Sequence, residues 1–222
     1  MSNTELPIKN WIMVPAIITL VVTVLRAAGE SLQWNETLFG SPSNPAAVVG
    51  ITWLIPIFGI YFGYKLAAAG HRPNSLGKAA LWLLAAFAVF VALAAAMFFL
   101  VSSTPSLLGG LGLAVVTALV LWIAFKGWRD MACVLTAYAY AARIPVAIII
   151  LLAIYGDWGT HYEAMVEGYE QPNLFLRWLE TGLFPQLTAN VVITVVFGGL
   201  FACLGALFAP KQSPSSPDEV AP

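Results

Sequence analysis

The chain has 222 residues, of which 60% are hydrophobic and only 9% are charged, whereas a soluble domain has about 25% charged residues. A soluble protein with so few charges would lack a hydrated surface, so lipid is the expected main solvent. The net charge of −1 excludes a strongly basic body, and no nucleic-acid-binding motif is present, so nucleic acid is not an expected partner.

Six long apolar runs follow one another along the chain. About 20 helical residues cross the hydrocarbon of a bilayer, and the runs are continuous, unlike the alternating strands of a membrane barrel. Helices are then the way to satisfy the backbone in lipid. The sequence predicts an all-α, polytopic integral membrane protein with six transmembrane helices over residues 11–208. The predicted spans are Trp11–Leu25, Ala46–Leu66, Ala79–Val101, Leu107–Phe125, Met131–Tyr155 and Leu183–Phe208.

The first of these runs is short enough to be compared with a secretory signal peptide. Its leader carries Glu5 beside a single basic residue, Lys9, and the segment Arg26–Ala28 is a poor cleavage site. A signal peptide normally has a clearly basic leader. We therefore expect an uncleaved first span, preceded by a cytoplasmic N-terminus over residues 1–10.

The loops between the runs alternate in charge. Short loops rich in Lys and Arg stay in the cytoplasm, so both termini are expected to be cytoplasmic (N-in, C-in) in a plasma or bacterial inner membrane. The tail over residues 209–222 is rich in Pro and Ser and is predicted to be disordered. The basic residues of the predicted cytoplasmic side are Lys9, Lys65, Arg72, Lys78, Lys126, Arg129 and Lys211. The acidic residues of the opposite side are Glu30, Glu36, Asp157, Glu163, Glu167, Glu170 and Glu180.

Small residues recur at intervals of four in several predicted spans. In lipid, small residues let helix backbones approach closely. These faces therefore predict close packing within the protein, and they are candidates for contact with a second copy or with another membrane protein. The residues are Gly59 and Gly63; Ala88, Ala92 and Ala96; Gly110, Ala114 and Ala118; and Gly198, Ala202 and Ala206.

The loop over residues 156–182 is the only extramembrane segment expected to hold structure. Its end, Asn173–Gly182, predicts a short interfacial helix that Asn173 caps and Gly182 ends. Earlier in the loop, carboxylates and one histidine are weak candidates for metal ligands, although the glycines among them favour a solvated acidic loop without metal. These weak candidates are Asp157, His161, Glu163 and Glu167.

Arg143 lies near the middle of the predicted fifth span. A guanidinium there costs about 2.5–3.5 kcal/mol, yet no Asp or Glu lies within the six runs. Neutral acceptors are therefore expected. Pro145 has no N–H, which frees the carbonyl of Ala141, and Thr136 and Tyr140 precede Arg143 on the same helix face. Other spans offer Asn190, Thr188, Thr194, Thr19 and Thr23.

Two functional interpretations of Arg143 stay open. It either ties helices together through carbonyls and hydroxyls, or binds an anionic group in a polar cavity. Enzymatic motifs are missing, and the two histidines lie on opposite predicted sides, which excludes haem held by paired intramembrane histidines. The sequence therefore predicts a non-catalytic membrane component, an accessory subunit or organiser, without a cofactor. The alternative is a small transporter or channel for an anionic or small solute at Arg143.

Overall fold

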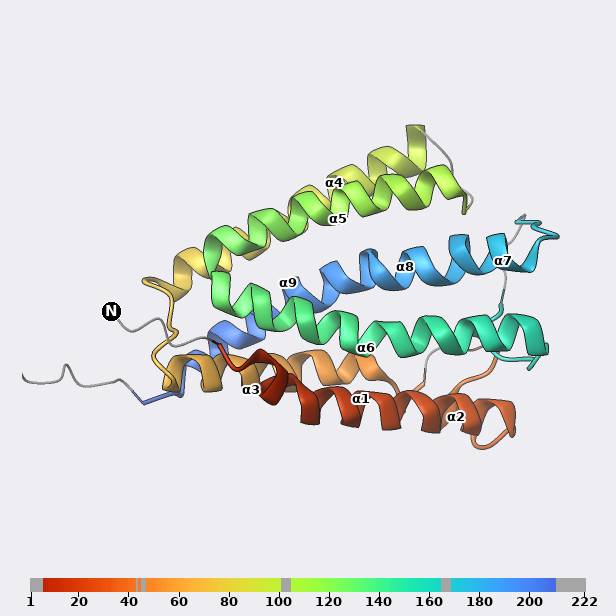
Figure 1. The fold of residues 1–222 in the computed structure, drawn as a ribbon, viewed down its shortest axis with the longest axis horizontal. Helices are drawn as coiled ribbons and strands as arrows, with labels where there is room; N and C mark the ends of the chain where they lie inside the picture. The colour runs from red at the N-terminus through yellow and green to blue at the C-terminus, as the bar shows by residue number, and fades with distance from the viewer. Residues whose placement is uncertain (1–5, 43, 45–46, 101–104, 165–168, 211–222) are drawn as a thin grey trace, which may run out of the picture.

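The computed structural model describes residues 6–42, 44, 47–100, 105–164 and 169–210 (Figure 1). Within these ranges the chain is helical and has no strand, and six of its helical segments are long and apolar enough to cross a membrane, as the sequence predicts. They are α1 (Ile8–Ser31), α3 (Leu54–Ala68) with the preceding 3-10 turn η1 (Ile51–Trp53), α4 (Leu76–Leu100), α5 (Leu107–Gly127), α6 (Arg129–Gly156) and the run Leu174–Leu207.

The helices form a bundle in which α4 and α5 make a hairpin along one side and α1 and α3 lie along the other (Figure 1). Between them lie α6 and the last helix, α9 (Ala189–Leu207), which packs against α3, α4, α5 and α6. Fully buried side chains from these helices, such as Phe62, Leu83, Met131 and Val195, form the core. The outward faces of the helices carry large apolar side chains, as expected of a surface solvated by lipid.

The contact between α3 and α9 is made by backbone against backbone. A Cβ added at Gly63 would lie 1.9 Å from the carbonyl oxygen of Ala202, and one at Gly205 would lie 2.1 Å from that of Ile60. Gly59 is equally crowded by Gly198. The predicted close packing of small residues is thus confirmed for the second and sixth spans. On the α4–α5 hairpin it is found only in part: Gly110 is buried against Phe184, whereas Ala88, Ala92, Ala114 and Ala118 are exposed.

The second span starts later than the sequence predicts. The predicted start at Ala46 lies outside the described residues, and residues 47–50 are not helical. Instead, Val48 and Val49 donate backbone hydrogen bonds to Thr37 and Leu38 in the short helix α2 (Glu36–Phe39). Because these bonds hold the segment against α2, its apolar side chains belong to a loop. The end of the predicted third span, Val101, also lies outside the described residues, as do residues 211–222 of the predicted tail.

The first helix is longer than expected and includes charged residues. It runs to Ser31, so Arg26 and Glu30, predicted to lie in a loop, occupy its last turns. Glu30 is buried there. The expectation that a carboxylate is absent from the spans was wrong, because the helix continues through Ala27, Ala28 and Gly29 without a residue that breaks it.

The predicted interfacial helix is continuous with the last span. Asn173 does cap its start, accepting a hydrogen bond from the Leu176 N–H at 3.0 Å. The helix then passes Gly182 through α7 (Leu174–Arg177), a π-helical segment η2 (Trp178–Leu183) and α8 (Phe184–Leu187). Gly182 does not end it, because this glycine packs against Ile150 of α6, where a Cβ would lie 2.7 Å from the Ile150 side chain. Pro185, which has no N–H to donate, follows the π-helical turns.

Candidate functional site

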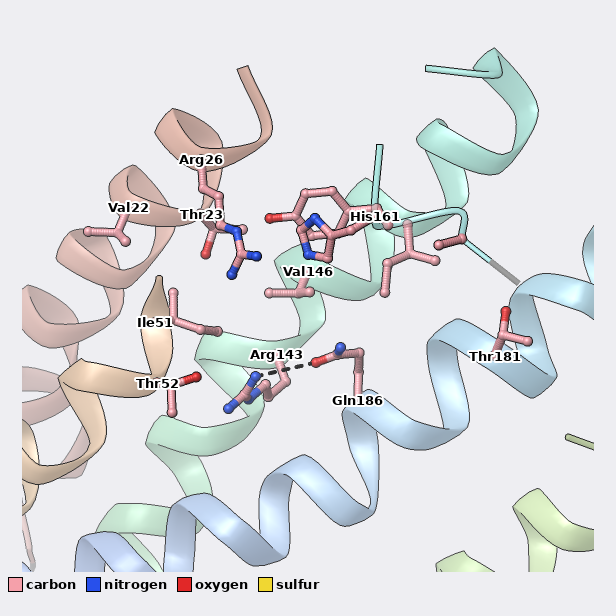
Figure 2. Close-up of a pocket in the computed structure, with 13 residues that line it drawn as sticks. Val22, Thr23, Arg26, Ile51, Thr52, Arg143, Val146, His161, Thr181 and Gln186 are labelled. Atoms are coloured by element: carbon pink, nitrogen blue, oxygen red, sulfur yellow. Dashed lines mark hydrogen bonds between the residues drawn. The ribbon is translucent and has the colours of Figure 1, made fainter. Parts of the chain in front are cut away.

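A cavity of about 230 Å³ opens beside Arg143 between α1, α6 and α8 (Figure 2). Three elements close it: η1, the loop that follows α6, and the π-helical segment η2. The wall mixes hydroxyl, amide and cationic groups with a few aliphatic side chains. The lining residues are Val22, Thr23, Arg26, Ile51, Thr52, Arg143, Val146, Ile150, His161, Tyr162, Ala164, Thr181 and Gln186.

Arg143 comes from the middle of α6 and is 7% exposed. Its Nη1 donates a long hydrogen bond of 3.5 Å to Oε1 of Gln186 (Figure 2). Its Nε is buried and has no hydrogen-bond partner among the described residues. A guanidinium carries five N–H donors in a planar fork, and a buried donor left unpaired is costly. Among the described residues, this guanidinium therefore has unused donors beside a polar cavity.

The acceptors predicted for Arg143 from the sequence are engaged elsewhere or lie away from it. Thr136 and Tyr140 do not line the cavity, and Thr136 is about 10 Å from Arg143 along the helix axis at about 1.5 Å per residue. The hydroxyl of Thr188 donates to the backbone carbonyl of Phe184, and the hydroxyl of Thr194 donates to the backbone carbonyl of Asn190. Pro145 lies inside α6, but no described hydrogen bond joins Arg143 to Ala141. The acceptor found is Gln186, which the sequence analysis did not select.

Arg26 is the second arginine of the cavity. Its side chain leaves α1 toward the loop backbone, where a Cβ at Gly50 would lie 3.3 Å from Nη1 and one at Gly40 would lie 3.5 Å from Nη2. Glycines at these two positions let the loop pass close to the guanidinium. Sequence reasoning missed Arg26 because it placed the residue outside the first span. A polar stripe does mark this face of α1: Thr19, Thr23, Arg26 and Glu30, at intervals of four, three and four.

The loop after α6 is fastened to α1 by Glu30. The carboxylate of Glu30 accepts a hydrogen bond of 2.5 Å from the backbone N–H of His161 and also contacts Nδ1 of the same residue. Burial and the positive charge of Arg26 lower the pKa of His161 below its usual value, although the Glu30 carboxylate acts in the opposite direction. The lowered pKa favours the uncharged imidazole. Burial likewise raises the pKa of the adjacent Tyr162 to about 12.

The cavity has an excess of positive charge. Arg26 and Arg143 contribute two cations to its lining, while the adjacent Glu30 carboxylate contributes one negative charge and His161 is neutral. The low-dielectric walls of a cleft concentrate the electric field of the charges that line it. The site therefore favours an anion over a cation.

The weak metal candidates do not converge. Both carboxylate oxygens of Glu163 accept backbone N–H groups, of Trp158 at 3.1 Å and Thr160 at 2.9 Å. His161 faces Glu30, and Asp157 lies exposed at the end of α6. Glu167 lies outside the described residues. In the described part of the chain, no three His, Cys, Asp or Glu side chains gather as metal ligands would.

Comparison with known proteins finds no relative whose site could be set beside this cavity. No family model, no curated protein and no solved structure matches the chain.

Proposed function

We propose that this protein is an integral membrane protein that binds a small anionic solute in the cavity between α1, α6 and α8. The observation that carries the proposal is the state of Arg143: a buried arginine that faces a polar cavity with one long hydrogen bond and an unpaired Nε. Ionisable groups inside a membrane mark solute and ion pathways. A packing arginine would instead have its donors satisfied by the protein.

The size and lining of the cavity suit a small organic or inorganic anion. A volume of about 230 Å³ is many times the ~10–15 Å³ that one water requires on the same measure. Guanidinium groups bind carboxylate and phosphate oxygens with two parallel hydrogen bonds. The hydroxyl of Thr52 and the amide of Gln186 offer further polar contacts. A carboxylate or phosphate of few heavy atoms is the solute class that these groups recognise.

The shape of the last span favours transport over permanent binding. Helical order is interrupted beside the cavity: η2 is π-helical, and Thr188 departs from helical geometry with φ −118° and ψ −87°. Transporters place solute sites at discontinuous helices, and one group of helices rocks against another around the site to alternate the access to it. The accessory-subunit interpretation becomes the alternative outcome of the test below.

The predicted orientation belongs to this proposal. Basic side chains gather at the end of the bundle where α6 begins, and Glu30, Glu163 and Glu180 lie toward the other end. By the positive-inside rule the first end is cytoplasmic, and the Arg143 cavity opens under the loop on the outer side. Single-cysteine variants of a Cys133→Ser, Cys203→Ala background check this: Asn74→Cys should react from inside the cell and Glu170→Cys from outside.

Ligand-dependent thermal stability tests the anion site. The purified full chain is melted in neutral detergent with acetate, succinate, phosphate or chloride, at constant ionic strength. We expect at least one oxyanion to raise the melting temperature of the parent by mass action, and this shift to be lost in Arg143→Met. Lys65→Met is the matched control, because Lys65 is exposed at the other end of α3. If no anion shifts the parent, the accessory interpretation replaces this one. Uptake into vesicles then separates a transporter from a receptor.

A further inference from the structure

A second, larger cavity lies at the opposite end of the bundle. It has a volume of about 430 Å³ and is formed by the loop between α3 and α4, the start of α4 and the junction of α5 with α6. Its lining is predominantly basic. The charged residues in it are Arg72, Lys78, Lys126, Arg129 and Asp130.

Few of the charged side chains of this pocket take part in the contacts that hold its walls in place. Trp128, at the junction of α5 and α6, is buried, and its Nε1 donates to the carbonyl of His71 at 2.8 Å. Nδ1 of His71 is 2.9 Å from Oδ2 of Asp130. Backbone packing adds to this, since a Cβ at Gly127 would lie 2.8 Å from Cβ of Trp82. The loop and the junction are thereby fixed to each other and to α4.

The described part of the chain does not neutralise the positive charge of the pocket. Its one carboxylate, Asp130, faces His71. Lys78 and Arg129 are exposed, and neither has an ion pair among the described residues. Arg72 donates from Nη2 to the carbonyl of Ala206, but its buried Nε has no partner in the described part of the chain. Four cations thus share a concave site with one carboxylate that is already engaged.

The surroundings of the pocket are those of a membrane interface. Trp82, in the pocket wall, is 43% exposed, and Lys126 lies over the ring of the exposed Trp122 at 4.6 Å. Tryptophans with such exposure are enriched at headgroup depth. An exposed face of α4 leads away from the pocket at helical spacing, from Lys78 through Leu81 and Trp82 to Ala85. A molecule bound here meets cations at one end and an apolar helix face at the other.

We propose that this pocket binds the phosphate of an anionic phospholipid, whose acyl chains lie along the exposed face of α4. Phosphate oxygens accept hydrogen bonds from several Arg and Lys donors at once, and basic pockets between membrane helices bind anionic headgroups. Free phosphate shares the headgroup's chemistry but would leave the adjoining apolar face unused. The site is separate from the Arg143 cavity, so the two can fail independently.

Lipid-dependent stability of the full chain in neutral detergent tests this site. The probes are phosphatidylglycerol, phosphatidylcholine, inorganic phosphate and glycerol 3-phosphate. The pocket variant is Lys78→Gln with Arg129→Gln, both exposed, so that the fold survives. The matched control is Lys9→Gln with Lys65→Gln, which removes two exposed cations outside the pocket. Because each such cation contributes about 1 kcal/mol to binding of an anionic lipid, the pocket variant should need about 30-fold more phosphatidylglycerol for the same melting shift.

Each result decides for or against the site. The proposal is supported if phosphatidylglycerol stabilises the parent and the control alike, and the pocket variant only at much higher concentration. An equal loss in the control would show general attraction between charges and would overturn the pocket. An equal shift with inorganic phosphate or glycerol 3-phosphate would overturn the lipid assignment, and so would an equal shift with phosphatidylcholine.

Discussion

The last span of the bundle makes two opposite kinds of contact along its length. Its second part, α9, touches α3 with glycine backbones and leaves no space between the two helices. The part before it, η2 and α8, contacts α6 at Ala147 and Ile150. Next to these contacts, the Arg143 cavity separates it from α6. The first contact is filled by backbone packed against backbone, whereas beside the second the Nε of Arg143 has no partner among the described residues. One half of the span is therefore closely packed, and the other half borders a polar cavity.

The largest loss of stability is expected from Gly63→Leu. A Cβ alone would lie 1.9 Å from the carbonyl oxygen of Ala202, so α3 and α9 would have to separate along their whole contact. We expect a loss of more than about 3 kcal/mol, at or beyond the upper end of overpacking effects, measured as the shift in reversible unfolding in detergent. Ala88→Leu, on the exposed face of α4, should be close to neutral. Equal stability of the two variants would show that α3 and α9 do not depend on this contact.

A smaller but local effect is expected from Glu30→Ala. Its carboxylate accepts two contacts from His161 and is buried at the edge of the cavity. Hydrogen bonds to a charged group contribute about 1.5–3 kcal/mol. We therefore expect a loss of about 2 kcal/mol together with faster proteolysis in the loop over residues 157–164. In the control Glu36→Ala the carboxylate removed is exposed, and cleavage of this loop should stay at the parent's rate.

Acidification should weaken the contact between Glu30 and His161 that attaches the loop after α6 to α1. Because the pKa of folded His161 is lowered by burial and by Arg26, the unfolded chain binds more protons below pH ~6.5, the usual histidine value. Stability then falls as the pH drops from about 6.5 toward the folded pKa, with a slope of at most about 1.4 kcal/mol per pH unit. A melting series from pH 7.5 to 5 measures it. In His161→Phe this slope should flatten, and an unchanged slope would assign the effect to another group.

The smallest expected effect is that of Trp178→Phe. Nε1 of Trp178 donates to the carbonyl of Ala147 at 2.8 Å and joins η2 to α6 beside the cavity. Phenylalanine keeps the aromatic packing against Phe175 but cannot donate. A loss of about 1 kcal/mol is expected for one hydrogen bond. Trp53→Phe removes an indole that is 65% exposed and should change the melting temperature less. A larger effect of Trp53→Phe would contradict this role of Trp178.

Several features of the site could be read from the sequence, and the missing ones share a cause. Arg143 stood out because a charge in an apolar run is costly wherever the run lies. Its partner Gln186 also lies within the predicted sixth span, Leu183–Phe208, but which polar side chain of that span meets Arg143 depends on how α8 lies against α6. Arg26 and Glu30 were assigned to a loop, since the apolar run ends before them although the helix does not. Polar residues at helix ends carry little signal in a scan for apolar segments.

The sequence by itself determined that this is a helical protein with six segments long and apolar enough to cross a membrane, because length and apolarity of a span are properties of neighbouring residues along the chain. It also pointed to several of the small residues that pack closely, since small residues four apart predict close packing. Only the tertiary structure decided which of them meet: Gly59 and Gly63 of α3 pack against α9, whereas Ala88 and Ala92 of α4 and Ala114 and Ala118 of α5 are exposed. It also decided that Arg26, Arg143 and His161 surround one cavity. The physical reason is that such a cavity depends on how far two helices stand apart, and that distance is set by contacts between residues remote in sequence, such as Gly182 against Ile150.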